Sequence, residues 1–271
     1  IENKCLFKQQ LRQEIINREV EVAAEIQRTL VPSRLPSSDH FQLSSIYKPH
    51  FAVGGDYYDV VEFPDGKIAF CIADITGKGV SAAMLMANFQ ANFHALVTRR
   101  PSLEEIVYEL NEAVWRVTQG DKFITLFLAK YDIPTRTLHY INAGHTPPLL
   151  LSNGEVIPLR NGCTSLGWLP ELPFLEIGGI CLTDDALIFT YTDGLTDIRN
   201  DEGDYFTEEK LIEFLQECAD MDAKSLNTKL LAHIETFRGE QPFPDDITVL
   251  TCRVFGSDPS ASARHEIVKV K

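Results

Sequence analysis

The chain has 271 residues, and its hydrophobic content of 44% is enough to bury one large core or two small ones. Its 39 acidic and 25 basic residues give a formal net charge of −14, which is the wrong sign for wrapping the phosphate backbone of a nucleic acid. No apolar run approaches the ~20 residues that a membrane-spanning helix needs. We therefore expect no nucleic acid as a partner and no membrane span within this chain.

The first predicted element is an amphipathic helix over residues 5–30. Apolar residues recur there at helical spacing among many charges, and Pro32 and Pro36 follow. We expect residues 1–36 to be a linker or regulatory segment of a longer protein, because the chain does not begin with methionine. Two interpretations stay open: a signalling or dimerisation helix, with a homodimer as one outcome, or a helix packed on its own domain.

The main domain is predicted over residues 37–255. Alternating or apolar runs predict strands over 41–48, 57–63, 67–73, 123–132, 137–142, 148–151, 174–180, 186–192 and 247–255. Helices are predicted over 80–98, 102–118, 207–219 and 223–237, with Ser102 as an N-cap. Helices in two blocks among many strands predict an α+β layered sandwich, because a doubly wound parallel sheet would need a helix after nearly every strand. We expect residues 256–271 to be a mobile tail.

The six cysteines form no CxxC pair, and several lie inside apolar runs. This pattern predicts reduced core residues in a reducing compartment such as the cytoplasm, and it disfavours a zinc site or a disulfide framework.

A β-hairpin is predicted around the turn Pro64-Asp65-Gly66. If the turn centres on Asp65, the numbers of paired residues sum to about 130, so Asp56 lies opposite Asp74 at the open end. Asp74 ends the apolar strand 67–73, and a charge in that place needs a partner such as a metal ion.

Two further strand ends carry aspartate in the same way. Asp193 directly follows the strand 186–192, and Asp245-Asp246 precedes the strand that begins at Ile247. Because neighbouring antiparallel strands share an edge, these acidic positions can converge with Asp56 and Asp74. Oxygen ligands favour Mg²⁺ or Mn²⁺, and two such ions about 3.5–4 Å apart can activate a bridging water. The glycines that follow would let a main-chain carbonyl near Ile75 reach a cation.

Other polar residues are weighed against structural roles. Asp59 lies three residues beyond Asp56, so on a regular strand it faces the opposite side. Asp184-Asp185 resembles Asp245-Asp246 locally, but a turn is its predicted role. His145 follows a strand, and it is either a catalytic acid or an imidazole bonded to loop backbone. The segment 74–79 lacks the P-loop order, and no serine or cysteine lies in a nucleophile elbow.

Six segments, taken in order, resemble the SpoIIE/RsbU-type serine phosphatases, the bacterial branch of the metal-dependent PPM protein phosphatase superfamily. The segments are EIQRTLVP at 25–32, GGDYYD at 54–59, ADITGKG at 73–79, AGHTPP at 143–148, YTDGLTD at 191–197 and DDIT at 245–248. This resemblance implies a four-layer αββα sandwich of two mainly antiparallel sheets flanked by helices, with an N-terminal helical extension. It also implies two Mn²⁺ or Mg²⁺ ions in the cleft between the sheets.

The resemblance further implies the ligands. Asp56 and Asp74 match the core ligands, Ile75 offers its carbonyl, and Asp193 and Asp245 complete the set. Asp245 is chosen over its neighbour because an Asn follows the last ligand in the related eukaryotic-type enzymes. Phe206-Thr207 departs from the Phe-Gly of many relatives, which affects a local loop. No phosphate-binding Arg stands near the start, so the metals alone would receive the phosphate.

The implied activity is hydrolysis of phosphoserine or phosphothreonine on a partner that resembles an anti-anti-sigma factor. An upstream sensor domain or regulator would act through the N-terminal helix. The alternatives are a catalytically weak phosphatase-like scaffold or phosphoprotein sensor, and a phosphoesterase for small molecules. Intact aspartates at every matched position argue against a decayed enzyme.

Overall fold

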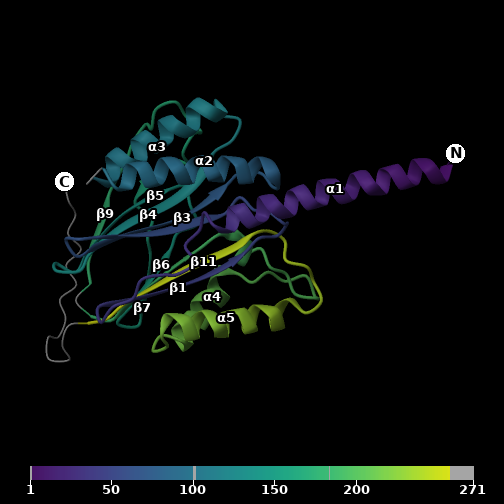
Figure 1. Ribbon diagram of the computed structural model, residues 1–271. Coiled ribbons are helices and arrows are strands. Elements are labelled where there is room, and N and C mark those ends of the chain that lie inside the picture. The colour runs from purple at the N-terminus through teal and green to yellow at the C-terminus, as the bar shows by residue number, and fades with distance from the viewer. Residues whose placement is uncertain (1, 100–101, 183, 257–271) are drawn as a thin grey trace.

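The computed structural model describes residues 2–99, 102–182 and 184–256. The domain that follows the first helix is built in four layers, in which two β-sheets lie face to face and a pair of helices covers each outer face (Figure 1). This arrangement confirms the predicted αββα sandwich. It arises because each sheet has one apolar face for the other sheet and a second apolar face for its helices.

The first sheet, sheet A, has the strand order β1-β11-β10-β6-β7. Its strands are β1 Phe41–Lys48, β6 Leu149–Ser152, β7 Glu155–Pro158, β10 Ala186–Tyr191 and β11 Ile247–Val254. The second sheet, sheet B, has the order β2-β3-β4-β5-β8, and β9 also pairs with β5. Its strands are β2 Tyr57–Phe63, β3 Lys67–Ile75, β4 Ile124–Asp132, β5 Thr137–Ala143, β8 Gly162–Cys163 and β9 Gly178–Cys181. The described pairings are antiparallel except that of β5 with β8.

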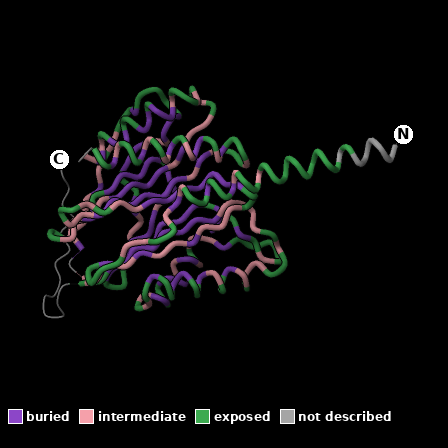
Figure 2. The backbone as a smooth tube through the Cα atoms, in the orientation of Figure 1, coloured by how far each residue is buried: buried purple, intermediate pink, exposed green. Residues whose placement is uncertain are grey.

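The helices follow the two blocks that the sequence predicts. Helices α2 Val80–Val97 and α3 Leu103–Thr118 cover sheet B, and α4 Glu208–Glu217 and α5 Ala223–Arg238 cover sheet A (Figure 1). The predicted N-cap is confirmed, because the Ser102 hydroxyl accepts a hydrogen bond from the Glu105 amide at 3.2 Å. Figure 2 shows the buried residues concentrated along the strands and on the inner faces of these helices.

The register of the predicted hairpin is confirmed. β2 pairs with β3 from Tyr57 with Ala73 to Phe63 with Lys67, so that paired numbers sum to 130. This register is fixed by the short turn, and it directs the residues that flank the open end toward one rim of sheet B.

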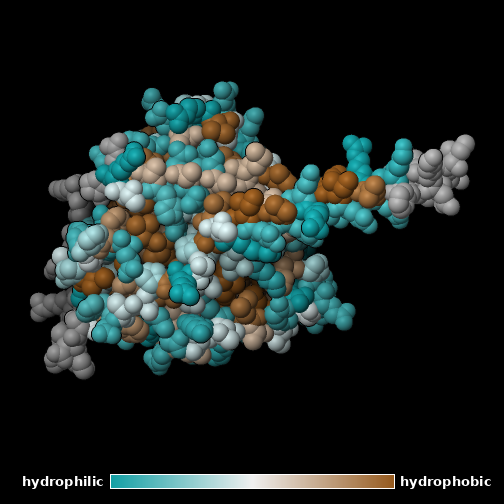
Figure 3. Space-filling view, in the orientation of Figure 1, coloured by the Kyte–Doolittle hydropathy of each residue, from teal (hydrophilic) through white to brown (hydrophobic). Residues whose placement is uncertain are grey.

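The first helix, α1 Glu2–Arg28, projects from the sandwich (Figures 1 and 2). Its last turns pack on the domain, where Gln27 donates to the Gly54 carbonyl at 2.7 Å and accepts from the Gly54 amide at 3.0 Å. Farther out, Leu11, Ile15 and Val22 are about half exposed, and brown and teal side chains alternate along the helix in Figure 3. The packed interpretation therefore holds for the last turns, and the outer part offers an exposed apolar face.

One predicted strand differs from the structure, and two observed strands were not predicted. The predicted strand 174–180 begins only at Gly178, because residues 174–177 pack Leu175 and Ile177 on the core without pairing with a strand. Strand β7 follows an Asn153-Gly154 turn in which both residues have positive φ, a hairpin signal that the prediction missed. Strand β8 has only two residues, which is too short for any pattern to show.

The structure also bears on the predictions about the cysteines, the C-terminal tail and membrane-spanning helices. The described cysteines Cys71, Cys163, Cys181, Cys218 and Cys252 are free, and most are buried, as predicted. Apart from Gly256, the predicted tail lies outside the described residues. None of the helices in the described residues has the length and apolar character that a bilayer span requires.

Candidate metal centre

The predicted carboxylates come together at one rim of both sheets. Asp56 precedes β2 and Asp74 lies near the end of β3, whereas Asp193 follows β10 and Asp245 precedes β11. Their proximity shows in their pKa values, because Asp74 raises the pKa of Asp56, Asp193 and Asp245 raise that of Asp74, and Asp245 also raises that of Asp193. The structure thus brings together four of the residues that the sequence singled out.

Asp56 is the most deeply buried of the group, with 1% of its surface exposed. Burial raises its pKa well above the ordinary value, and the neighbouring charge of Asp74 raises it further. Its Oδ2 accepts a hydrogen bond from the Thr192 hydroxyl at 2.8 Å. Thr192 belongs to the turn after β10, so this bond joins a loop of sheet B to the end of a strand of sheet A.

Asp74 lies at the centre of the charge cluster. Burial raises its pKa to about 7, and the carboxylates of Asp193 and Asp245 add to the shift. The only cation among the main causes is Lys78, which lowers the pKa. Cations that bind to the rim stabilise it, because they neutralise this surplus of negative charge.

The adjacent residues Asp245 and Asp246 have different surroundings. Both Asp246 oxygens are taken by main-chain amides, that of His50 at 2.6 Å and that of Gly55 at 2.7 Å. Asp245 Oδ2 instead forms an ion pair with the half-exposed Lys78 ammonium at 2.8 Å. Asp246 therefore holds the loop before β2, and Asp245 has the oxygen that a cation can reach by displacing the Lys78 ammonium.

Two glycines make this arrangement possible. A Cβ on Gly54 would lie 2.5 Å from Asp246 Oδ2, and one on Gly55 would lie 2.8 Å from the Ile75 carbonyl oxygen. Both distances are too short for a side chain. Gly55 thereby lets the Ile75 carbonyl approach the loop that contains Asp56, at the place where the sequence predicts a main-chain ligand.

The donor set fits hard divalent cations. Every predicted ligand is an oxygen, and Mg²⁺ and Mn²⁺ prefer oxygen ligands. Among the described residues no three His, Cys, Asp or Glu side chains form one closed ligand group. An Mg²⁺-type site needs none, because it is typically held by one or two carboxylates together with carbonyl oxygens, waters and substrate phosphate.

Asp59 turns away from this rim. It is buried, and its Oδ2 accepts from the Tyr57 hydroxyl at 2.5 Å and lies 2.6 Å from His94 Nε2 on α2. It therefore ties β2 to α2, on the side opposite to the metal rim that the strand alternation predicts.

His145 is also close to the rim, but its ring is buried. Its Nδ1 lies 2.9 Å from the Thr125 hydroxyl, and burial lowers its pKa to about 4. The ring is neutral at pH 7, so it lacks the proton that an imidazolium acid would donate. Nδ1 therefore contacts the side chain of Thr125 on β4, whereas the structural interpretation of His145 expected a bond to loop backbone.

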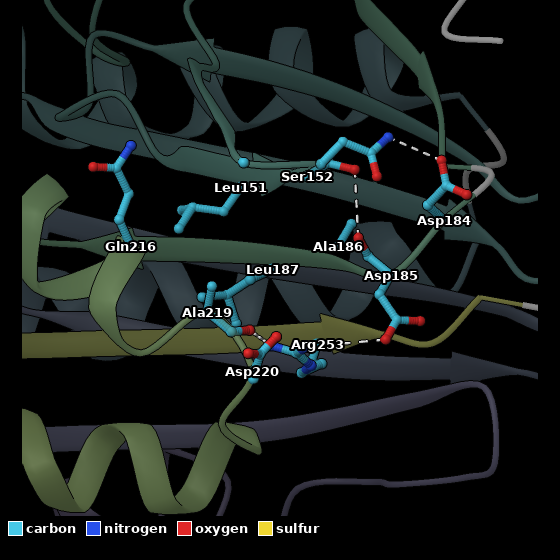
Figure 4. Close-up of a pocket in the computed structure, with 12 residues that line it drawn as sticks. Leu151, Ser152, Asp184, Asp185, Ala186, Leu187, Gln216, Ala219, Asp220 and Arg253 are labelled. Carbon is cyan, nitrogen blue, oxygen red and sulfur yellow. Dashed lines mark hydrogen bonds and ion pairs between the residues drawn. The ribbon is translucent and has the colours of Figure 1, made fainter. Parts of the chain in front are cut away.

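Asp184-Asp185 lies at the other end of the sandwich. There it borders a cavity of about 410 Å³, together with Arg253 and Ser152 (Figure 4). The run of β10 from Ala186 to Asp193 places this cavity roughly 23 Å from the metal rim. The cavity therefore belongs to a separate part of the molecule.

Two residues that contribute to the rim were not predicted from the sequence. Thr192 positions Asp56, yet a threonine next to a strand end carries no signal of its own. Lys78 was seen only as a failed P-loop lysine, although it is a cation between two predicted ligand segments. A positive charge between two segments of predicted aspartate ligands was a signal in the sequence that could have identified Lys78.

The sandwich and its acidic rim define a class of protein, the PP2C-type phosphatase domain. The SiaA-PP2C domain of Pseudomonas aeruginosa superposes with a TM-score of 0.77 at 25% identity, over 91% of this chain and 99% of that one. The PP2C phosphatase domain of SpoIIE from Bacillus subtilis matches with a TM-score of 0.71 at 17% identity, over 81% of this chain and 64% of that one.

Within that class, the family model for Stage II sporulation protein E (SpoIIE) matches residues 64–255, and the chain belongs to this family. Protein IcfG of Synechocystis sp. is 29% identical over 281 residues, which is 91% of this chain and 43% of IcfG. Phosphoserine phosphatase RsbU of Bacillus subtilis is 27% identical over 193 residues, which is 70% of this chain and 57% of RsbU. The chain thus spans about half the length of these curated relatives.

Proposed function

We propose that this chain is a metal-dependent protein serine/threonine phosphatase that hydrolyses phosphoserine or phosphothreonine on a signalling partner. The observation that carries the proposal is the convergence of carboxylates from both sheets around the buried Asp56, where neighbouring aspartates raise the pKa values of Asp56, Asp74 and Asp193 and Lys78 is the counter-charge. Such a cluster is unfavourable on its own and becomes favourable when it binds cations.

The ligands in this proposal are Asp56, Asp74, Asp193 and Asp245, with the Ile75 carbonyl. Two Mn²⁺ or Mg²⁺ ions bound there would supply an activated water and receive the negative charge of the phosphate. Asp246 keeps the loop before Asp56 in place through two amides.

The charge of the chain disfavours a nucleic-acid substrate, because a strongly acidic chain repels a polyanion. RsbU is named a phosphoserine phosphatase, and the proposal extends that substrate class to this chain. We further propose an anti-anti-sigma-factor-like partner, and a cytoplasmic location in which the free cysteines stay reduced.

The projecting α1 supports regulation from outside the domain. Its exposed apolar residues suit a second helix, and its last turns contact Gly54, two residues before Asp56. In this proposal an upstream sensor domain, a regulator or a second copy of the chain acts on the rim through α1.

The decisive experiment is phosphate release from phosphoserine proteins of the same cell, compared with an aryl phosphate, in Mn²⁺, Mg²⁺ or EDTA. We expect turnover that needs the metal and is faster on one phosphoprotein. Metal-dependent turnover of small esters alone would indicate a phosphoesterase. Binding of a phosphoprotein without turnover would indicate the scaffold or sensor.

A further inference from the structure

Lys78 supplies a positive charge to the rim, and its ammonium has no part yet in the proposed chemistry. Its Nζ lies 2.8 Å from Asp245 Oδ2 and donates a hydrogen bond to the Pro244 carbonyl at 3.1 Å. The same charge lowers the pKa values of Asp74 and Asp193. The ammonium therefore acts on three of the four carboxylates that are predicted to bind the cations.

The Lys78 side chain has room to change partners. It is 47% exposed, and the Asp245 side chain is 36% exposed. A Cβ built on the neighbouring Gly79 would have no group beyond its chain neighbours within 4 Å, so the space beside the lysine is open. An ion pair at such a surface is held weakly, because solvent screens the two charges.

Two partners compete for the same Asp245 oxygen. A divalent cation that binds there has twice the charge of the ammonium, so it displaces Lys78 from the carboxylate. The main chain of Lys78 is tied to the rim, because it lies four residues after Asp74 and two residues before α2 begins at Val80. The released ammonium therefore remains at the rim without the carboxylate partner that it has in the structure.

We propose that Lys78 is a phosphate-binding residue, whose ammonium pairs with Asp245 before the cations bind and with the substrate phosphate afterwards. This role rests on the proposed function. An ammonium has three rotatable donors on a flexible stem, which suits a phosphate that must enter and leave. Lys78 thus adds a protein cation to a site in which the family resemblance leaves the phosphate to the metals alone.

Lys122 is the matched control, because it is a second lysine at the same turn with different partners. Its ammonium bonds two neutral oxygens, the Ser81 hydroxyl at 2.9 Å and the Thr76 carbonyl at 3.5 Å. A general effect of positive charge on the site would appear in variants of either lysine. An effect that depends on the exchange of partners at Asp245 would appear only in variants of Lys78.

Three measurements on the full chain test the inference. Calorimetric titration gives the affinity for Mn²⁺, and thermal unfolding in saturating Mn²⁺ with increasing inorganic phosphate gives the affinity for phosphate. Hydrolysis of an aryl phosphate gives KM and kcat. Lys78→Met removes the charge and keeps most of the side-chain volume, Lys78→Arg keeps the charge, and Lys122→Met removes the charge of the control residue.

We expect two changes of opposite sign in Lys78→Met. Its affinity for Mn²⁺ should rise about three- to tenfold, because no ammonium competes for Asp245. Its affinity for phosphate should fall about tenfold or more, with KM raised more than kcat is lowered, because a charge-assisted hydrogen bond is lost. Lys78→Arg should recover most of the phosphate affinity. Lys122→Met should change both affinities by less than about twofold.

Unchanged phosphate affinity in Lys78→Met would overturn the phosphate-binding role, and so would equal losses in Lys78→Met and Lys122→Met. Weaker Mn²⁺ binding by Lys78→Met would show that the lysine holds Asp245 for the metal, which contradicts the exchange of partners. The proposed function survives each of these outcomes. Failure of the unaltered protein to bind Mn²⁺ would refute the proposed function, and the role of Lys78 with it.

Discussion

The two ends of the sandwich both carry a pair of aspartates in front of a strand, but only one end gathers charge. At the far end Arg253 lies 4.0 Å from Asp185, the Gly256 amide donates to Asp185, and the Asn153 side chain donates to Asp184. At the rim, Asp245 joins aspartates from three other strand ends, and Lys78 is the nearby cation. An acidic pair thus predicts a metal only where several strand ends converge.

The difference has an energetic side. At the far end Asp184 and Asp185 each have a local donor or cation. The rim carboxylates oppose folding without a cation, since burial and mutual repulsion raise the pKa values of Asp56, Asp74 and Asp193. Local instability of this kind is typical of functional sites.

The largest expected effect is a loss of activity that should follow a change at the rim and should not follow the matched change at the far end. Asp74→Asn should reduce Mn²⁺-dependent phosphate release by at least about a thousandfold, because a carboxylate ligand at the centre of the cluster would be worth several kcal/mol of transition-state stabilisation. Circular dichroism should show the fold largely intact. Asp185→Asn, the matched change at the far end, should leave the rate unchanged. Retained activity in Asp74→Asn would remove that residue from the site.

The second prediction tests whether Asp245 or its neighbour Asp246 is the metal ligand. Asp245→Asn should weaken Mn²⁺ binding about tenfold or more, because it removes a charged ligand. Asp246→Asn should instead lower the free energy of unfolding by about 1–3 kcal/mol, because its amide group would face a main-chain N–H. Calorimetric titration and denaturant unfolding measure the two effects. A reversed result would make Asp246 the ligand.

A third prediction concerns pH in the absence of metal. The pKa of Asp74 is about 7 in the folded protein, so between pH 4 and 7 the unfolded chain loses this proton while the folded chain keeps it. Asp74 therefore destabilises the fold increasingly as the pH rises through that range. In EDTA, Asp74→Asn should become more stable than the unaltered protein by an amount that grows to roughly 2–4 kcal/mol.

The stability of Asp74→Asn must be compared with that of the unaltered protein, because His145 contributes a pH dependence of stability with the opposite sign. Its pKa is lowered to about 4, so it stabilises the fold as the pH rises, and it does so equally in both proteins. Urea unfolding at several pH values gives the difference. A stability difference that does not change with pH would contradict the assigned pKa of Asp74.

The smallest effect tests the far end. Arg253 donates to the Ala219 and Met221 carbonyls, so Arg253→Met should lower the free energy of unfolding by about 1–3 kcal/mol. Asp185→Asn should change it by less than about 0.5 kcal/mol, because the Asp185 side chain is 59% exposed. Neither variant should alter the affinity for Mn²⁺. A change in affinity would show that the two ends are coupled.

The layers of the fold could be predicted because its strands and helices have strong periodic patterns. The hairpin register followed from one turn, and it placed Asp56 and Asp74 correctly at the open end. The element at 174–177 was predicted wrongly, because an apolar alternation shows burial and cannot show whether a strand partner is present.

The candidate site was predictable to the level of its strand ends. The sequence could not show that Asp246 is held by two amides while Asp245 is not, because that depends on a loop nearly 200 positions away in the sequence. It also could not show that the buried His145 ring contacts Thr125, because that contact depends on how the loop after β5 packs against β4.

The central claim is that carboxylates from both sheets bind a pair of cations. Anomalous diffraction from a crystal of the full chain soaked in Mn²⁺ tests it most directly. We predict two peaks about 3.5–4 Å apart, bordered by Asp56, Asp74, Asp193 and Asp245. Manganese bound only at the Asp184-Asp185 end, or rim carboxylates that contact no metal at saturating Mn²⁺, would contradict it.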